Sequence, residues 1–103
     1  MSKLAVIAKI TAQEGKGDEL VAAFQAYFPQ VGTEEGTEVY ALHRDNANAD
    51  TFYVYELYPG MDALVAHGGS DAFKEMGKAM GGLLAGAPEL MMLSPIVAKG
   101  LDI

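Results

Sequence analysis

The sequence contains no cysteine, no tryptophan and only two histidines among its 103 residues. Without cysteine, the chain can form no disulfide and offers neither a thiolate nucleophile nor a zinc–thiolate site. Two histidines, His43 and His67, are too few for a multi-histidine metal centre within one chain. No flavin, nicotinamide or phosphate-binding motif is present either. We therefore expect neither a metal nor a cofactor.

Basic residues are also scarce, with seven Lys and Arg against fourteen Asp and Glu, a formal net charge of -7. Such a chain repels the phosphates of nucleic acid and an anionic membrane surface. No apolar run approaches the roughly 20 residues that a bilayer span needs. The apolar start is broken by Lys9 and does not have the form of a signal peptide. We expect a cytoplasmic protein that binds neither nucleic acid nor membrane.

Hydrophobic residues make up 50% of the chain, and their spacing predicts seven elements of secondary structure. Apolar runs rich in β-branched and aromatic residues predict strands, and apolar residues three and four positions apart predict helices. Pro29 should end or distort the first helix, and Pro95 implies a bulge or an edge position in the last strand. The predicted strands cover residues 3–11, 38–44, 51–58 and 89–100, and the predicted helices cover residues 18–31, 59–67 and about 71–84.

This order of elements, with the second helix in two pieces, is that of a ferredoxin-like α+β fold. It gives a four-stranded antiparallel sheet with helices on one face, in a single domain spanning residues 1–103. Every predicted strand is nevertheless apolar on both faces, although helices cover only one. A second sheet is the natural cover for the other face, so we expect a homodimer with the sheets packed face to face.

Several motifs together resemble those of the antibiotic biosynthesis monooxygenase superfamily of dimeric α/β barrels. The resemblance spans Val6 to about Val97, and it implies a ligand held between the sheet and the helices. It also implies that Phe52, Val54 and Glu56 face that ligand, whereas Tyr53, Tyr55 and Leu57 face the partner subunit. The matching motifs are Tyr40 ahead of the His-Arg-Asp run 43–45, the pair Tyr55-Glu56, Ala63-Leu64, His67, and Ser70 followed by Phe73.

The sequence differs from the family's motifs in two places, and each difference excludes an activity that the resemblance would otherwise imply. Many members carry a second histidine just before the phenylalanine, but the corresponding run here is Ser70-Asp71-Ala72-Phe73. A haem-degrading branch uses an asparagine, a tryptophan and a histidine at the positions of Ala8, Tyr58 and Gly77, and none of them matches. We therefore expect neither a mechanism that needs two histidines nor the degradation of haem.

Two residues are candidates for proton transfer. Burial would raise the pKa of Glu56 and make it an acid or base usable near neutral pH. The alternative is a structural glutamate bonded to a backbone amide or to Arg44. His67 could accept a phenolic proton, and the alternative is a capping or surface histidine. We interpret His43 as a solvated surface residue.

Six further residues are candidates for substrate contact: Tyr40, Phe52, Tyr58, Phe73, Met76 and Met80. A tyrosine can pack its ring and hydrogen-bond an oxygen-bearing ligand with its hydroxyl, and methionines adapt to flat apolar molecules. Each of the six has core packing as its alternative role. The register of the hairpin stays open by one residue, so either Tyr40 or Val39 lies opposite Glu56.

The first hypothesis for function is a cofactor-independent monooxygenase acting on an aromatic phenol or quinol, with His67 or Glu56 as the proton acceptor. The second is an isomerase or lyase of the autoinducer-processing type on the same fold. It would need Arg44, Lys74 or Lys78 to bind a phosphate. The third is a non-enzymatic dimeric protein that binds a small apolar or aromatic molecule. The fold by itself does not decide among them.

Overall fold

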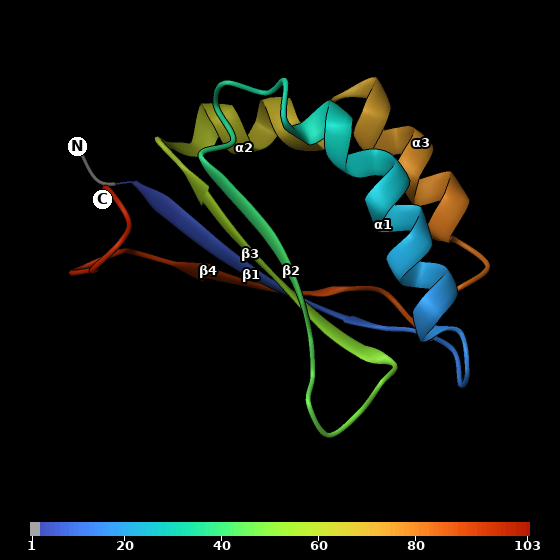
Figure 1. Ribbon diagram of the computed structural model, residues 1–103. Coiled ribbons are helices and arrows are strands. Elements are labelled where there is room, and N and C mark those ends of the chain that lie inside the picture. The colour runs from blue at the N-terminus through green and yellow to red at the C-terminus, as the bar shows by residue number, and fades with distance from the viewer. Residues whose placement is uncertain (1–2) are drawn as a thin grey trace.

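The computed structural model describes residues 3–103, and it confirms the ferredoxin-like α+β fold. The elements are β1 Leu4–Thr11, α1 Gly17–Val31, β2 Val39–Arg44, β3 Thr51–Tyr58, α2 Met61–Gly68, α3 Asp71–Met80 and β4 Glu89–Leu93. The sheet is antiparallel with the strand order β2-β3-β1-β4. All three helices lie on one side of it (Figure 1). No helix of the described residues is long and apolar enough to cross a membrane.

The register of the central strands places Glu56 in the middle of the helix-facing side of the sheet. Tyr40 of β2 is its partner on one side, and Val6 of β1 is its partner on the other. Directly opposite residues of neighbouring strands project to the same face. The register therefore shows that Tyr40, and not Val39, lies opposite Glu56.

The hydrophobic core fills the space between this face and the helices. On α1, Leu20, Phe24, Tyr27 and Val31 recur at helical spacing and are buried. They pack against the helix-facing residues of β1 and β3, of which Val54 is 1% exposed. The sheet and α1 thus form a rigid base, against which α2 and α3 carry the remaining side chains of the candidate site.

Helix α1 ends at Val31 as predicted, and Pro29 lies inside the helix without ending it; the side chain of Val31 is buried in the core. Two other predicted boundaries lie several residues beyond the observed ones. Helix α3 ends at Met80 rather than near Leu84, because two glycines follow it and glycine disfavours helix. Strand β4 ends at Leu93, since Pro95 has no N–H to pair. The predicted edge position of this strand is confirmed.

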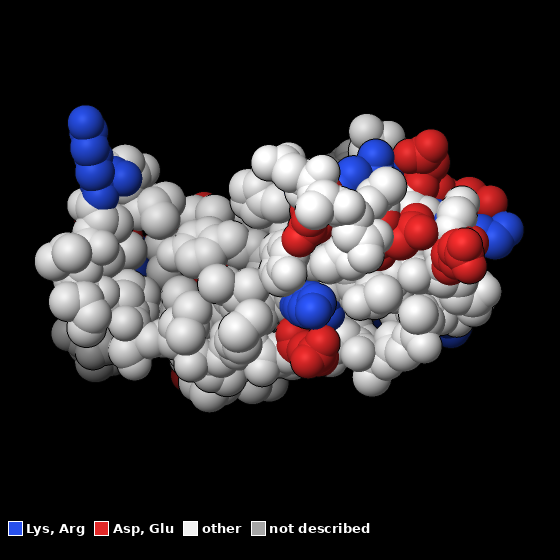
Figure 2. Space-filling model, turned by 90° about the horizontal axis from the view of Figure 1, so that it is seen from below, with Lys and Arg blue, Asp and Glu red and all other residues white. Residues whose placement is uncertain are grey.

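The outer face of the sheet, away from the helices, carries few charges. Figure 2 shows this face, with charged side chains gathered over one end and a wide uncharged area over the other. Met91 and Leu93 of β4 are 43% and 42% exposed here. Leu57 was expected to face a partner subunit, but it is already covered within the chain, at 1% exposure. The C-terminal segment returns to this end of the sheet, where Lys3 Nζ donates to the carbonyl oxygen of Asp102 at 2.6 Å.

Candidate active site

A cavity of about 480 Å³ lies between the helix-facing side of the sheet and helices α2 and α3. This volume falls within the range of small-molecule sites. We call its buried part the closed end and its solvent-exposed border the open side. The closed end includes Phe24, Val54, Glu56 and His67, and the open side includes Gly68, Gly77, Pro88, Leu90 and Met92.

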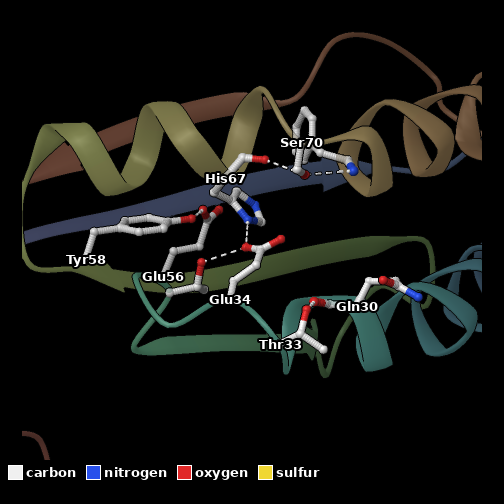
Figure 3. A network of polar contacts seen from close by, with 9 residues as sticks. Gln30, Thr33, Glu34, Glu56, Tyr58, His67 and Ser70 are labelled. Atoms are coloured by element: carbon white, nitrogen blue, oxygen red, sulfur yellow. Dashed lines mark hydrogen bonds and ion pairs between the residues drawn. The ribbon is translucent and has the colours of Figure 1, made fainter.

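A histidine–carboxylate pair stands at the closed end (Figure 3). Nδ1 of His67 lies 2.6 Å from Oε1 of Glu34, and the imidazole is 3% exposed. The other ring nitrogen, Nε2, is buried and has no hydrogen-bond partner among the described residues. We assign the proton to Nδ1, because a carboxylate can only accept from it. Nε2 is then an acceptor in the wall of an apolar cavity.

Local structure on both sides holds this pair in place. His67 lies at the C-terminal end of α2, where its carbonyl oxygen accepts a hydrogen bond from Ser70 Oγ at 2.8 Å. Ser70 is also the N-cap of α3, since its Oγ accepts from the backbone N–H of Phe73 at 3.1 Å. Glu34 lies in the loop between α1 and β2, where Thr37 Oγ1 donates to it at 2.8 Å. The imidazole is thus positioned by the N-cap residue of α3 and by the loop between α1 and β2.

Aromatic rings surround the imidazole. The ring centroids of Tyr40, Phe73 and Tyr58 lie 5.0, 5.3 and 5.8 Å from that of His67. Burial raises the pKa of the Tyr40 and Tyr58 hydroxyls well above its usual value, and the nearby charge of Glu56 raises it further. These hydroxyls therefore stay protonated at neutral pH and remain hydrogen-bond donors.

The carboxyl group of Glu56 is buried and accepts one side-chain hydrogen bond from the described residues. Tyr58 donates its hydroxyl to Glu56 Oε1 at 2.5 Å. Burial raises the pKa of Glu56, although the hydrogen bond from Tyr58 opposes the rise. The expectation of a raised pKa is confirmed. The alternative in which Glu56 bonds to Arg44 is wrong, because the guanidinium of Arg44 pairs with Asp18 at 3.0 Å.

The structure brings six of the eight candidate residues to the cavity: Tyr40, Glu56, His67, Phe73, Met76 and Met80. It does not bring Phe52 there, because this ring is fully buried and lies beneath the guanidinium of Arg44 at 5.0 Å. Tyr58 is also fully buried and does not line the cavity, but it contacts two residues that do, Glu56 through its hydroxyl and His67 through its ring. His67 is not a surface histidine, because only 4% of it is exposed. His43 is exposed, as expected.

Glu34 was missed by the sequence reasoning. It lies in a loop of seven residues, 32–38, all of them polar or glycine, next to a second glutamate, and nothing in that pattern distinguishes Glu34 from Glu35. The contact with His67 joins residues 33 positions apart. Only the packing of α2 over this loop makes the pair, so a single sequence carries no signal for it.

Neither lysine nor arginine lines the cavity. Arg44 pairs with Asp18, and Lys78 pairs with Glu75 on the exposed side of α3. Among residues 3–103 there is also no cluster of three or more His, Cys, Asp or Glu that could hold a metal ion. The described cavity thus has no cation to bind a phosphate, and its chemistry rests on one imidazole, one carboxyl and the tyrosine hydroxyls.

The fold and the cavity together define a ferredoxin-like α+β protein with a small-molecule site between sheet and helices. Residues 3–79 match the family model described as antibiotic biosynthesis monooxygenase. The match covers most of the chain, and it agrees with the motifs around Tyr40, Glu56 and His67. The chain belongs to the antibiotic biosynthesis monooxygenase family.

Solved structures agree with this assignment. A protein from Caulobacter crescentus, named after the same family, is 37% identical over 93% of this chain and 92% of that chain, with a TM-score of 0.87. PA3566 from Pseudomonas aeruginosa is 26% identical over 94% of this chain and 97% of that chain, with a TM-score of 0.85. Rv0793 from Mycobacterium tuberculosis, at 24% identity, 96% and 100% coverage and a TM-score of 0.84, shares the fold. None of the curated proteins matches the chain.

Proposed function

We propose that this protein is a monooxygenase that oxidises an electron-rich phenol or quinol with molecular oxygen. The observation that carries the proposal is the pair at the closed end. His67 is fixed by Glu34 through Nδ1, and its buried Nε2 has no partner of its own. A phenolic hydroxyl that entered the cavity would supply that partner.

The proposed reaction begins with proton transfer. Nε2 of His67 accepts the proton of the phenolic hydroxyl, and Glu34 stabilises the imidazolium that forms. The resulting phenolate is a stronger reductant than the phenol and can transfer electrons to oxygen. With a hydroquinone, one oxygen atom forms a C–O bond at a ring C–H carbon, and the other is reduced to water with two hydrogens from the substrate, so the product is a hydroxyquinone. The substrate supplies both electrons that this second atom requires.

The surroundings of the pair suit this chemistry. The hydroxyl of Tyr40 stays protonated because burial raises its pKa, so it can donate to the phenolate oxygen. Phe73, Met76 and Met80 provide an apolar wall that limits the access of water to a reactive anion. Glu56 is a second proton acceptor in the same cavity, but Tyr58 already occupies one of its oxygens.

Oxygen consumption by the purified protein with a panel of hydroquinones tests the proposal. His67→Gln should lower the rate by about 10²–10⁴-fold, which is the usual contribution of a general base. His43→Gln is the matched control, because His43 is exposed and lies outside the cavity. A wild-type protein that consumes no oxygen with any member of the panel would contradict the proposal. So would equal rates for the two histidine variants.

The two alternatives make different predictions. A non-enzymatic binder would lose affinity for a phenol in His67→Gln without having any turnover to lose. An isomerase or lyase of a phosphorylated substrate would require a cation at the cavity, and the described lining contains none. We therefore keep the binder as the competing function and regard the phosphate-dependent reaction as unsupported.

We also propose that two copies of the chain pack through the outer faces of their sheets. This face has a wide uncharged area (Figure 2), and Met91 and Leu93 lie exposed on it. Sedimentation should give the mass of two chains, and Met91→Asp should give one, since a buried unpaired charge opposes association. Met92→Asp, on the opposite face of the same strand, is the control. A wild-type monomer at micromolar concentration would contradict the proposal.

A further inference from the structure

Gly77 is a glycine in the interior of helix α3 with no structural reason to be one. Glycine is the least favourable residue in a helix apart from proline. Its backbone has no positive φ, since only Gly15 and Gly100 do. A Cβ built at position 77 meets no atom within 4 Å. Neither conformation nor packing therefore requires glycine there.

Two other glycines show what a structural requirement looks like in this chain. A Cβ at Gly17 would lie 2.4 Å from the backbone oxygen of Ala49, and a Cβ at Gly36 would lie 3.0 Å from Cβ of Ala63. Both positions exclude a side chain because the chain itself fills the space. At Gly77 the same space is empty.

The empty space next to Gly77 belongs to the cavity. Gly77 and Gly68 border its open side from the helices, and Leu90 and Met92 border it from β4. The two strand residues are 64% and 48% exposed, so residues 3–103 leave this border of the cavity largely open to solvent. A side chain at position 77 would project into this opening.

We propose that Gly77 is a specificity-determining residue, which keeps the open side wide enough for ligands larger than a single ring. A larger residue at this position would restrict the cavity to ligands of a single ring. The inference rests on the proposed function only in taking the cavity as the ligand site. It adds a size limit and assigns that limit to one position.

The binding of three neutral hydroxyarenes by calorimetry tests this inference: phenol, 1-naphthol and 9-phenanthrol. The wild-type affinity should rise with the number of rings, because each ring buries more apolar surface. Gly77→Leu should bind 9-phenanthrol at least about tenfold more weakly, the scale of forcing carbons into occupied space. Its affinity for phenol should stay within about twofold of the wild type.

Gly77→Ala separates a role in the ligand site from a role in the fold. It should raise the melting temperature by roughly 4 °C, because alanine favours helix over glycine. It should nevertheless weaken 9-phenanthrol binding relative to phenol. Gly81→Ala is the matched control, since its Cβ would make only ordinary contacts of 3.6 Å and it does not line the cavity. This control should leave the order of the three affinities unchanged.

Three results would overturn the inference. The first is a wild-type protein that binds the three probes equally. The second is a folded Gly77→Leu variant whose three affinities match those of the wild type, and the third is one that loses all three to the same extent. Because these probes report binding alone, the monooxygenase proposal can fail while the size limit holds. A protein that ranks the probes as expected but consumes no oxygen would show that outcome.

Discussion

The two ends of the cavity are built in opposite ways. At the closed end, the imidazole of His67 and the carboxyl of Glu56 are buried and held by hydrogen bonds: His67 by Glu34 at 2.6 Å, and Glu56 by Tyr58 at 2.5 Å. On the open side, glycines and exposed apolar side chains such as Leu90 line a gap that no polar contact spans. The closed end can hold a reacting atom in a defined position, whereas the open side can only limit what enters.

This difference gives the two ends separate roles: the closed end affects the reaction rate, and the open side affects which ligands bind. A fixed imidazole with a free acceptor nitrogen lowers the activation barrier of a proton transfer. A bare helix surface makes no bond that strengthens in a transition state, so it affects which ligands bind and not how fast they react. Substitutions at the closed end should therefore change turnover or stability, and those on the open side should change binding or nothing.

Among the substitutions that leave His67 in place, Glu34→Gln should have the largest effect, and that effect is on turnover. This variant removes the charge that stabilises the imidazolium and permits the wrong tautomer of His67. The rate of oxidation should therefore fall by about 100-fold, the lower end of the contribution of a general base. The ring tautomer, read from ¹⁵N chemical shifts, should change at the same time. A purely structural Glu34 would leave that spectrum unaltered.

Glu35→Gln is the matched control for this variant. Glu35 is the next residue of the same loop and is exposed, whereas the carboxylate at His67 Nδ1 belongs to Glu34. Its rate should equal that of the wild type within about twofold. Equal losses in the two variants would mean that the loop, rather than the carboxylate on Nδ1, matters.

The closed end also shows what a single sequence can and cannot predict. Strand alternation placed Glu56 in one row with Phe52 and Val54, and the family resemblance assigned that row to the ligand side. The apolar spacing of α3 placed Phe73, Met76 and Met80 on one side of that helix, and the structure brings them to the cavity. Local periodicity is carried by the sequence, whereas the choice of face came from the family. The same alternation could not tell that Phe52 is sealed in the core or that Glu34 reaches His67. Those outcomes depend on how loops and helices pack over the sheet.

A smaller effect is expected from Tyr58→Phe, which removes the hydrogen bond to Glu56. At neutral pH the loss should destabilise the fold by about 2 kcal/mol, the scale of a hydrogen bond to a charged group. Burial raises the pKa of Glu56 above 4.5, so wild-type stability is full below that pH and falls as the pH rises through the raised pKa. The Tyr58 bond lowers that pKa, so its removal should make the fall steeper.

Thermal unfolding between pH 4 and pH 8 measures this dependence. The gap between the wild type and Tyr58→Phe should be small at the acid end and should widen as Glu56 ionises. In a Glu56→Gln background, the cost of Tyr58→Phe should not vary with pH, because no titrating group accepts the bond. A gap of constant size in the wild-type background would show that Glu56 does not ionise in this range.

The smallest expected effect is that of Leu90→Ala on the open side. Leu90 is 64% exposed, and truncation of such a residue should change the free energy of unfolding by no more than about 0.5 kcal/mol. Leu57→Ala, at 1% exposure, is the reference for a covered strand leucine and should cost about 2–5 kcal/mol. If Leu90→Ala instead costs more than about 1 kcal/mol, and the cost grows with protein concentration, then a second chain covers the opening. The contrast between a closed and an open end would then hold only for the single chain.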